Sequence, residues 1–517
     1  MQLNVLAYFE HGAARKCPDK VAVVDGPREI TFANLRSGAR RFAALLVARA
    51  DVTGRPVAVY LPKSAEVVIA DLAILYSGNI YTNLDVKSPP KRLANILAHI
   101  GPQLVVTSRL RADEIVAAGI AQNDILFIEE LGEADQPATD TDLDLTEIEG
   151  RLDRVIDTDP VCIINTSGST GTPKGVALSH RGTIDFMDWV FDTFAFDDQV
   201  VIGSLSPFYF DIFTLELFLC LSKGATIIII PEQLASFPGK LMEFLVETKI
   251  NFLFWVPTVM VNIANLGLLQ KIALPDLQTV FFAGEVFPTR HLNMWRSTLP
   301  QARFVNLYGP IEIHVDCTYQ VIEGEMADDE PLSIGRPCRN TDILILSEAN
   351  QACSVDEQGE LCVRGTSLAL GYWNDPEKTA RAFVQNPLNP HYPELIYRTG
   401  DLAVRRADGR IFLAGRKDYQ IKHMGYRVEL PEIEHQVLGI PGIANACVVY
   451  DQPKKAITLF YQPDGDAVAV ATIRQALAAI FPKYMLPTVF YPMERLPINP
   501  NGKIDRNGLI QQLSGGA

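Results

Sequence analysis

The sequence lacks the features that mark exported, membrane-spanning or nucleic-acid-binding proteins. Its eight cysteines are scattered and include no CxxC pair, so we expect reduced thiols. The N-terminus carries acids and a histidine where a signal peptide has an apolar run, and apolar stretches such as Ala225–Pro231 are far too short to cross a bilayer. The net charge of −15 argues against nucleic acid or an anionic membrane as the main partner. These observations predict a cytoplasmic protein.

Short apolar runs alternate with segments of helical periodicity along most of the 517 residues. Runs that are apolar on both faces and separated by helices are typical of parallel sheets covered on both sides. We therefore predict an α/β fold with α+β elements. The predicted strands are 57–61, 103–107, 161–165, 225–230, 251–256 and 277–284, and amphipathic helices are expected at 66–77 and 238–249.

The pattern changes after about residue 335, which predicts a division into domains. The runs DILILSE, GELCVRG and GRIFLAG indicate short strands joined by turns, and hence a β-rich subdomain at about 335–417. Beyond it, a helix from Pro431, strands near 443–450 and 456–462, and a helix at 468–481 form a compact α+β pattern. We place the boundary near Asp418, with an N-terminal core at 1–417 and a small mobile domain at 418–517.

A glycine-rich loop follows the predicted strand at 161–165. It reads NTSGSTGTPKGVALSH from Asn165 to His180. The nucleotide-binding P-loop requires glycine before its lysine, but here Lys174 follows Pro173, so that interpretation fails. A tight turn is the simplest structural reading. Hydroxyl and backbone donors in succession between a strand and a helix nevertheless make a good cradle for an anion.

Six motifs in order resemble those of the adenylate-forming superfamily, which includes acyl-CoA synthetases, luciferases and the adenylation domains of nonribosomal peptide synthesis. They are TSGSTGTPKG (166–175), NLYGPIE (306–312), GELCVRG (359–365), YRTGDLA (397–403), GRKDYQIKHMGYRVEL (415–430) and PINPNGKID (497–505). The resemblance covers essentially the whole chain. It implies a reaction in two halves, in which a carboxylate attacks the α-phosphate of ATP and a thiol then attacks the resulting acyl-adenylate.

The resemblance also implies roles for residues around the nucleotide. The phosphate-binding loop supplies Thr166, Ser167, Gly168, Ser169, Thr170 and Lys174, with Thr170 near the α-phosphate. Tyr308 is expected to stack on adenine, Asp401 to accept hydrogen bonds from the ribose, and Arg416 to add a cation beside it. Glu312, with Thr170, is expected to hold Mg²⁺ through hard oxygen ligands. Lys503 is the expected catalytic cation, and Asp418 the hinge about which the small domain rotates.

The stretch SPFYFDIFTLELF (206–218) resembles the amino-acid-activating branch, with Asp211 positioned to bind the α-ammonium group. A fatty or aryl acid would leave this carboxylate buried without a partner. The other pocket positions implied by the resemblance are Ile212, Leu215, Phe254, Phe281, Ala283, Leu307, Val315 and Asp316, together with Lys503. This mostly apolar lining favours a small or medium apolar side chain. Asp316 stays open: it could assist a secondary ammonium, bind a polar side chain or point to solvent.

The pattern is similar to that of stand-alone prolyl-carrier-protein ligases of secondary metabolism, although Ile311 replaces the threonine of the common YGPTE motif. The sequence shows no carrier-protein motif after Lys503, so we expect the thiol to come from a separate phosphopantetheinylated peptidyl carrier protein. Lys454, Lys455 and Lys483 are candidate docking residues. The alternatives are a D-alanyl (or other small amino acid) carrier protein ligase and an acyl-CoA ligase. A non-catalytic nucleotide-binding protein is disfavoured because Lys503 and Glu312 are both present.

Overall fold

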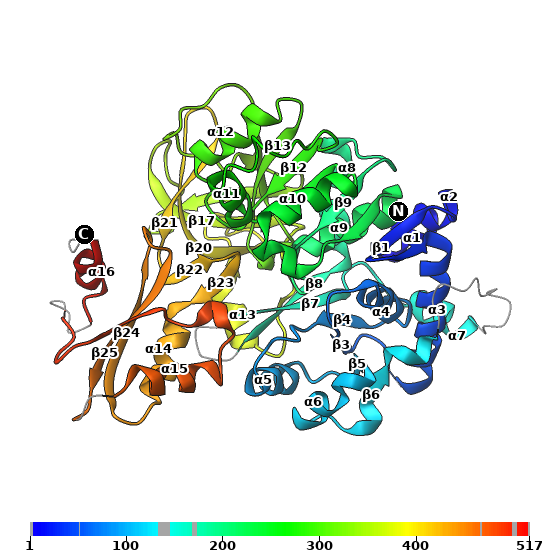
Figure 1. Ribbon diagram of the computed structural model, residues 1–517, viewed down its shortest axis with the longest axis horizontal. Helices are drawn as coiled ribbons and strands as arrows, with labels where there is room; N and C mark the ends of the chain where they lie inside the picture. The colour runs from blue at the N-terminus through cyan, green and yellow to red at the C-terminus, as the bar shows by residue number, and fades with distance from the viewer. Residues whose placement is uncertain are drawn as a thin grey trace.

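The computed structural model describes residues 4–50, 52–132, 145–167, 173–465, 468–498 and 504–514. Three sheets form the larger part of the molecule, and a smaller group of elements follows residue 418 (Figure 1). Two of the three sheets are mainly parallel, as expected for the alternation of apolar strands and helices. The α/β fold class is therefore confirmed.

The seven-stranded sheet carries the glycine-rich loop at the end of one of its strands. Its order is β18 (Gly371–Tyr372), β8 (Lys174–Ser179), β7 (Pro160–Thr166), β4 (Ile80–Asn83), β3 (Pro56–Tyr60), β5 (Leu104–Thr107) and β6 (Ile125–Phe127). The strands from β7 to β6 run parallel, whereas β8 and β18 pair antiparallel at one edge. Thr166 ends β7 and Lys174 begins β8, so the loop joins two neighbouring strands.

The nine-stranded sheet carries three residues of the predicted substrate pocket, Phe254, Phe281 and Leu307. Its order is β15 (Arg336–Pro337), β14 (Thr318–Val321), β13 (Arg303–Tyr308), β12 (Thr279–Phe282), β11 (Phe252–Trp255), β9 (Val201–Ser204), β10 (Thr226–Ile229), β1 (Val21–Asp25) and β2 (Arg28–Thr31). The strands from β13 to β1 run parallel. Their carboxyl ends therefore meet at one edge, where ligands bind in open parallel sheets.

Strand residues alternate between two cores, which explains why the strands are apolar on both faces. On β11, Phe252 and Phe254 belong to the core shared by the two large sheets, whereas Leu253 and Trp255 belong to a second core on the outer face. The shared core is filled by α4 (Ala65–Tyr76) and α9 (Ile212–Lys223), which are buried almost all round, and is bordered by α3 (Phe32–Arg49) and α8 (His180–Phe194). Helices apolar on every side are buried in this way.

The remaining helices cover the outer faces. α10 (Pro238–Glu247), α11 (Pro257–Asn265) and α12 (Thr289–Thr298) pack on the nine-stranded sheet, and α5 (Pro90–Ile100) and α6 (Ala112–Ala117) pack on the seven-stranded sheet. The short helices α1 (Leu6–His11), α2 (Ala13–Lys16), α7 (Thr146–Leu152) and α13 (Pro376–Ala382) complete this part. Within the described ranges, no helix has the length and hydropathy needed to cross a membrane.

The predicted β-rich region is an antiparallel five-stranded sheet. It consists of β16 (Thr341–Leu346), β17 (Gln358–Gly365), β20 (Leu395–Arg405), β19 (Phe383–Gln385) and β21 (Ile411–Arg416). Beyond it come the hairpin β22 (Gln420–His423) and β23 (Tyr426–Glu429), then α14 (Leu430–Leu438), β24 (Ile443–Asp451), β25 (Ala456–Pro463), α15 (Val470–Ala478), β26 (Val489–Pro492) and α16 (Arg506–Ser514). All the strands and helices predicted from the sequence are present within a few residues.

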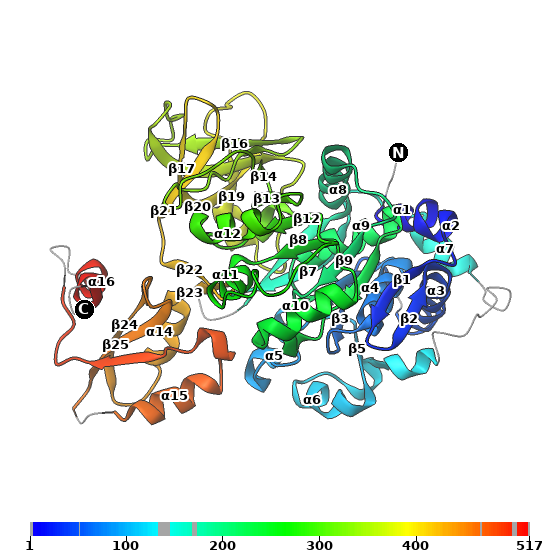
Figure 2. The ribbon, with the colours of Figure 1, turned by 45° about the horizontal axis from the view of Figure 1, so that its top comes forward.

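Figure 2 shows the elements from α14 onward beside the large body, with β22 and β23 between them, as in Figure 1. Side-chain contacts support this arrangement. Arg92 on α5 pairs with Glu432 on α14 at 3.4 Å, and Tyr426 stacks on Tyr484 with ring centroids 3.6 Å apart. The described chain includes all eight cysteines, and each is a free thiol, as predicted.

Candidate active site

Glu312 lies at the centre of the site and is completely buried. It sits in a single turn after β13. Its Oε1 accepts a hydrogen bond from the Tyr372 hydroxyl at 2.8 Å and lies 3.2 Å from Lys174 Nζ, while its Oε2 lies 2.7 Å from Arg427 Nη1. Burial alone would raise the pKa of this carboxyl, but the charges of Arg427 and Lys174 outweigh it and hold the pKa well below its usual value. Glu312 is therefore an anion between two cations.

Lys174 and Ser167 connect this centre to the glycine-rich loop. Burial, reinforced by the charge of Arg427, lowers the pKa of Lys174. The Ser167 hydroxyl donates a hydrogen bond to the backbone oxygen of Arg427 at 2.6 Å, so the hairpin β22–β23 contacts the loop directly. Thr166, also at the end of β7, is buried beside it. Gly168, Ser169, Thr170 and Lys503 lie outside the described residues.

The predicted magnesium site does not fit the metal in this arrangement. Both oxygens of Glu312 are engaged by cations or a hydroxyl group. A hard divalent cation needs free carboxylate or carbonyl oxygens. In the part of the chain that the structure describes, no three His, Cys, Asp or Glu side chains are grouped to hold a metal ion.

The residues predicted to bind the nucleoside form one network. The Tyr308 hydroxyl donates to Asp401 Oδ2, and Arg416 Nη1 lies 2.6 Å from Asp401 Oδ1. Antiparallel pairing of β20 and β21 places Asp401 directly opposite Arg416. Arg416 also donates two bonds to Asp418, from Nε at 2.6 Å and from Nη2 at 2.8 Å. The predicted hinge residue is therefore tied to the predicted ribose acceptor through one guanidinium group.

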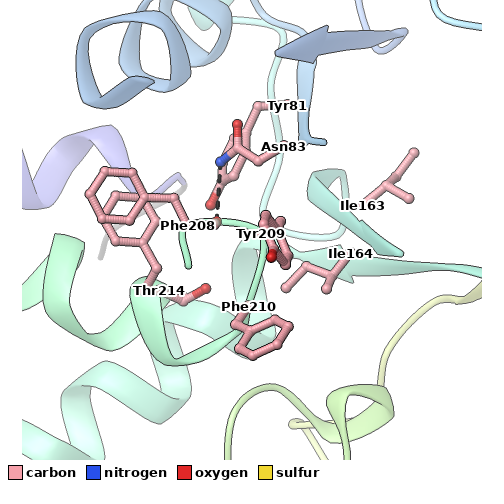
Figure 3. A pocket seen from close by; sticks show the side chains of 9 residues that line it. Tyr81, Asn83, Ile163, Ile164, Phe208, Tyr209, Phe210 and Thr214 are labelled. Atoms are coloured by element: carbon pink, nitrogen blue, oxygen red, sulfur yellow. Dashed lines mark hydrogen bonds between the residues drawn. The ribbon is translucent and has the colours of Figure 1, made fainter. Parts of the chain in front are cut away.

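Asp211 immediately precedes α9, where backbone N–H groups favour an anion. Burial raises the pKa of its carboxyl to about 6, against the opposing charge of Lys422 and the hydrogen bonds from backbone N–H groups. The segment that carries Asp211 is fixed from the other sheet, because Asn83 on β4 donates to the backbone oxygen of Phe208 at 3.3 Å (Figure 3). Asn83 also donates to Asp71 at 2.9 Å. A cavity of about 10 Å³ beside this segment is too small for an amino acid.

The predicted apolar lining comes together from α9 and three neighbouring strands. Phe254 and Phe281 are paired across β11 and β12, with ring centroids 6.0 Å apart. Phe281 also packs on Phe194 at 4.7 Å, which places it in an aromatic cluster of the shared core. The remaining apolar positions are all buried in this core; they are Ile212, Leu215, Ala283, Leu307 and Val315.

A strained loop presents Asp316. His314 and Val315 have φ values of 54° and 51°, a region that β-branched residues rarely enter. The imidazole of His314 holds the loop, since its Nε2 accepts from the Ser179 backbone N–H at 3.0 Å and its Nδ1 lies 2.8 Å from the Ser367 backbone oxygen. Such strain persists where the surroundings fix the backbone.

Asp316 itself is 2% exposed, so the alternative in which it points to solvent is wrong. No donor among the described residues reaches its Oδ2. Burial raises the pKa of this carboxyl well above its usual value, and the negative charge of Asp211 adds to the effect. The carboxyl groups of Asp211 and Asp316 therefore interact electrostatically in the same region of the predicted pocket.

The sequence prediction did not assign Lys422, Arg427, Tyr372 or Glu285, although the first two lie within the motif at 415–430. Lys422 on β22 has its Nζ 5.8 Å from the ring centroid of Tyr308 and interacts electrostatically with Asp211 and Asp316. Its pKa is lowered by burial. Lys422 and Arg427 lie in the hairpin β22–β23. Only the fold, which places this hairpin against the site, shows that the two residues reach it.

Comparison with protein-family models matches residues 9–373 to the AMP-binding enzyme model, and residues 432–503 to the AMP-binding enzyme C-terminal domain. The chain belongs to the AMP-binding enzyme family. This confirms the resemblance that the six motifs indicated, and the first match alone includes the site residues from Thr166 to Tyr372.

The chain is also similar to individual proteins and solved structures. It is 33% identical to tyrocidine synthase 2 of Brevibacillus parabrevis over 98% of this chain, but spans only 14% of that protein. It is 29% identical to the L-proline--[L-prolyl-carrier protein] ligase of Pseudomonas fluorescens, with 98% of each chain covered. Among solved structures, IdnL1 superposes with a TM-score of 0.79 at 26% identity, covering 95% of this chain and 98% of that one.

Proposed function

We propose that this enzyme activates an amino acid with ATP and transfers it to the phosphopantetheine thiol of a separate peptidyl carrier protein, in secondary-metabolite biosynthesis. The observation that carries the proposal is the Asp211 carboxylate at the start of α9, in an otherwise mostly apolar pocket. An anion there needs a cationic partner. The α-ammonium group of an amino acid supplies one, whereas a fatty or aryl acid does not.

L-Proline is the proposed substrate. The apolar lining suits its ring, and the prolyl ligase relative is matched along its whole length. A secondary ammonium has two N–H donors, one for Asp211 and one for Asp316, whose Oδ2 lacks a donor in the described chain. The alternatives are D-alanine or another small amino acid, and, less favoured by Asp211, an acyl-CoA ligase activity.

In the first half-reaction, a carboxylate oxygen of the amino acid forms a bond to the α-phosphorus of ATP. The bond from this phosphorus to the bridging oxygen breaks, and pyrophosphate leaves. We assign Tyr308, Asp401 and Arg416 to holding the nucleoside. Thr166 to Thr170 and Lys174 bind the phosphates, and Lys503 supplies positive charge at the reacting carboxylate. In the second half-reaction, the carrier thiol releases its proton to water and its sulfur bonds to the acyl carbon. The bond from this carbon to the phosphate oxygen breaks, and AMP leaves.

We propose that residues 1–417 and 418–517 are two domains that change their relative position between the half-reactions, with Asp418 as the hinge. The bidentate contact of Arg416 with Asp418 supports this role, because it fixes one side of the connecting segment to the nucleoside site. Lys454, Lys455 and Lys483, which are exposed, are the proposed contacts for an acidic carrier protein.

Amino-acid-dependent exchange of labelled pyrophosphate into ATP tests the proposal. We expect L-proline to support exchange above the other amino acids, D-alanine included, and above aryl and fatty acids. Exchange only with aryl or fatty acids would overturn the argument from Asp211. Loading of radiolabelled proline onto a phosphopantetheinylated carrier protein, compared with CoA as acceptor, separates a carrier protein ligase from an acyl-CoA ligase.

A further inference from the structure

The segment 205–211, which joins β9 to α9 and carries Asp211, begins between two charged side chains. Lys63 lies between β3 and α4, and its Nζ donates to the backbone oxygen of Ser204 at 2.7 Å. Glu216 on α9 accepts a hydrogen bond from the Ser204 hydroxyl group. Ser204 is the last residue of β9 and is completely buried. A cation and an anion therefore contact the same residue, at the point where the segment begins.

These contacts fix the segment at both ends and in the middle. Glu216 lies in the second turn of the helix that Asp211 precedes, so its bond to Ser204 ties the start of α9 to the end of β9. Lys63 also reaches the middle of the segment, because its Nζ lies 5.3 Å from the ring centroid of Phe208. The chain between the strand and the helix is thus a closed loop with Lys63 against it.

Phe208 connects the middle of this loop to α9 and to the other sheet. Its ring stacks on that of Phe213 with centroids 3.8 Å apart, and its backbone oxygen accepts from Asn83 at 3.3 Å (Figure 3). Lys63 follows β3 and Asn83 ends β4, which are parallel neighbours in the seven-stranded sheet. The carboxyl edge of one sheet therefore sets the path of the backbone that leads to Asp211 on the other.

The two opposite charges stand in a part of the core where charge is costly. Glu216 is completely buried, and its Oε1 has no hydrogen-bond partner within the described chain. Burial raises the pKa of Glu216 and lowers that of Lys63, and each charge opposes this effect at the other. Replacing two such charges by uncharged side chains is often neutral or stabilising, whereas removing one of them is strongly destabilising. Together they add little net stability, and what they supply is a defined position.

We propose that Lys63 is a positioning residue that directs the Asp211 carboxylate toward the ammonium group of the amino acid, with Glu216 as its counter-charge. Both side chains act through Ser204 and Phe208 rather than by contact with the amino acid. This rests on the proposed function in one respect, the assignment of Asp211 to the ammonium group. Displacing this carboxylate weakens binding of the amino acid and leaves the nucleoside site, which other elements form, unchanged.

Pyrophosphate exchange with Lys63→Met tests this role. Methionine keeps a long apolar side chain but removes the charge and the donor to Ser204. The KM for the amino acid should rise by about fivefold, because small displacements of a binding group are costly, while the KM for ATP changes by less than about twofold. An unchanged KM for the amino acid, or an equal rise in both constants, would overturn the proposal.

The double variant Lys63→Met/Glu216→Gln separates positioning from stability. Because no uncompensated buried charge remains, its free energy of unfolding should exceed that of Lys63→Met and approach that of the wild type. The KM for the amino acid should stay raised, since the donor to Ser204 is still missing. Recovery of this KM together with stability would show that Lys63 only balances a buried charge, which contradicts a positioning role.

The matched control is Lys20→Met, at the opposite end of the same strand. Lys20 also donates to a backbone oxygen, that of Asp198, shortly before β9 begins. Its removal should leave the KM for the amino acid within about twofold of the wild type. An equal rise in Lys20→Met and Lys63→Met would show that any loosening of β9 is sufficient, and the assignment to Lys63 would be wrong.

Hydrogen exchange of the ligand-free protein gives a readout that needs no substrate. Lys63→Met should speed exchange at the amides of Phe210, Phe213 and Thr214, which are hydrogen-bonded in the turns around Asp211, and leave β12 unchanged. Unchanged exchange at these three amides would overturn the inference. If no amino acid supports pyrophosphate exchange, the proposed function fails, yet hydrogen exchange still decides whether Lys63 fixes the segment. The two proposals therefore fall separately.

Discussion

Replacing Asp211 with asparagine should stabilise the protein while removing its proposed amine recognition. Burial raises the pKa of this carboxyl from 3.8 to about 6, so the folded state binds its proton more tightly than the unfolded chain does, although the group is still ionised at neutral pH. The free energy of unfolding of the wild type therefore falls as the pH rises from about 4 through 6, and it stays lower at neutral pH. A shift of this size corresponds to up to about 3 kcal/mol. Asparagine carries no charge and avoids this cost.

The assay is chemical denaturation of ligand-free wild type and Asp211→Asn across pH 4 to 8. We expect the variant to be more stable at pH 7.5, with a difference that disappears as the pH falls to about 4. In parallel, the KM for the amino acid in pyrophosphate exchange should rise by at least about tenfold, because a charge-assisted hydrogen bond is lost. A stability difference that does not depend on pH, or an unchanged KM, would refute the reasoning.

Three further substitutions test other parts of the site. Gly182→Ala would place Cβ 2.3 Å from the buried ring of His314, and should lower the free energy of unfolding by about 1–3 kcal/mol, measured with denaturant; a neutral effect would show that the ring can move. Glu285→Ala removes the acceptor of Gly425 N–H, and should slow loading of the carrier protein while pyrophosphate exchange changes by less than about twofold. Slowing of both carrier loading and pyrophosphate exchange would contradict a role confined to holding the β22–β23 hairpin in place. Asp401→Asn should raise the KM for ATP by about tenfold, measured by exchange at varied ATP, and an unchanged KM would remove it from the nucleoside site.

The apolar strand pattern and the six motifs determined much of the fold and the family from sequence. Strands that are apolar on both faces require cover on both sides, and the structure supplies it through α4 and α9 within and other helices outside. Three residues that the motifs assign to the nucleoside, Tyr308, Asp401 and Arg416, meet in one network. Short-range sequence patterns carry this information because they report local periodicity and local chemistry.

The tertiary structure decided which charges face one another. Asp316 could point to solvent or into the pocket on sequence grounds, and only the strained backbone at His314 and Val315 places it inside. The pairing of Glu312, in the turn after β13, with Arg427 on β23 joins residues 115 positions apart. No sequence pattern specifies such a contact, because it depends on how the hairpin packs against the large body. Burial then determines how strongly the two charges attract each other.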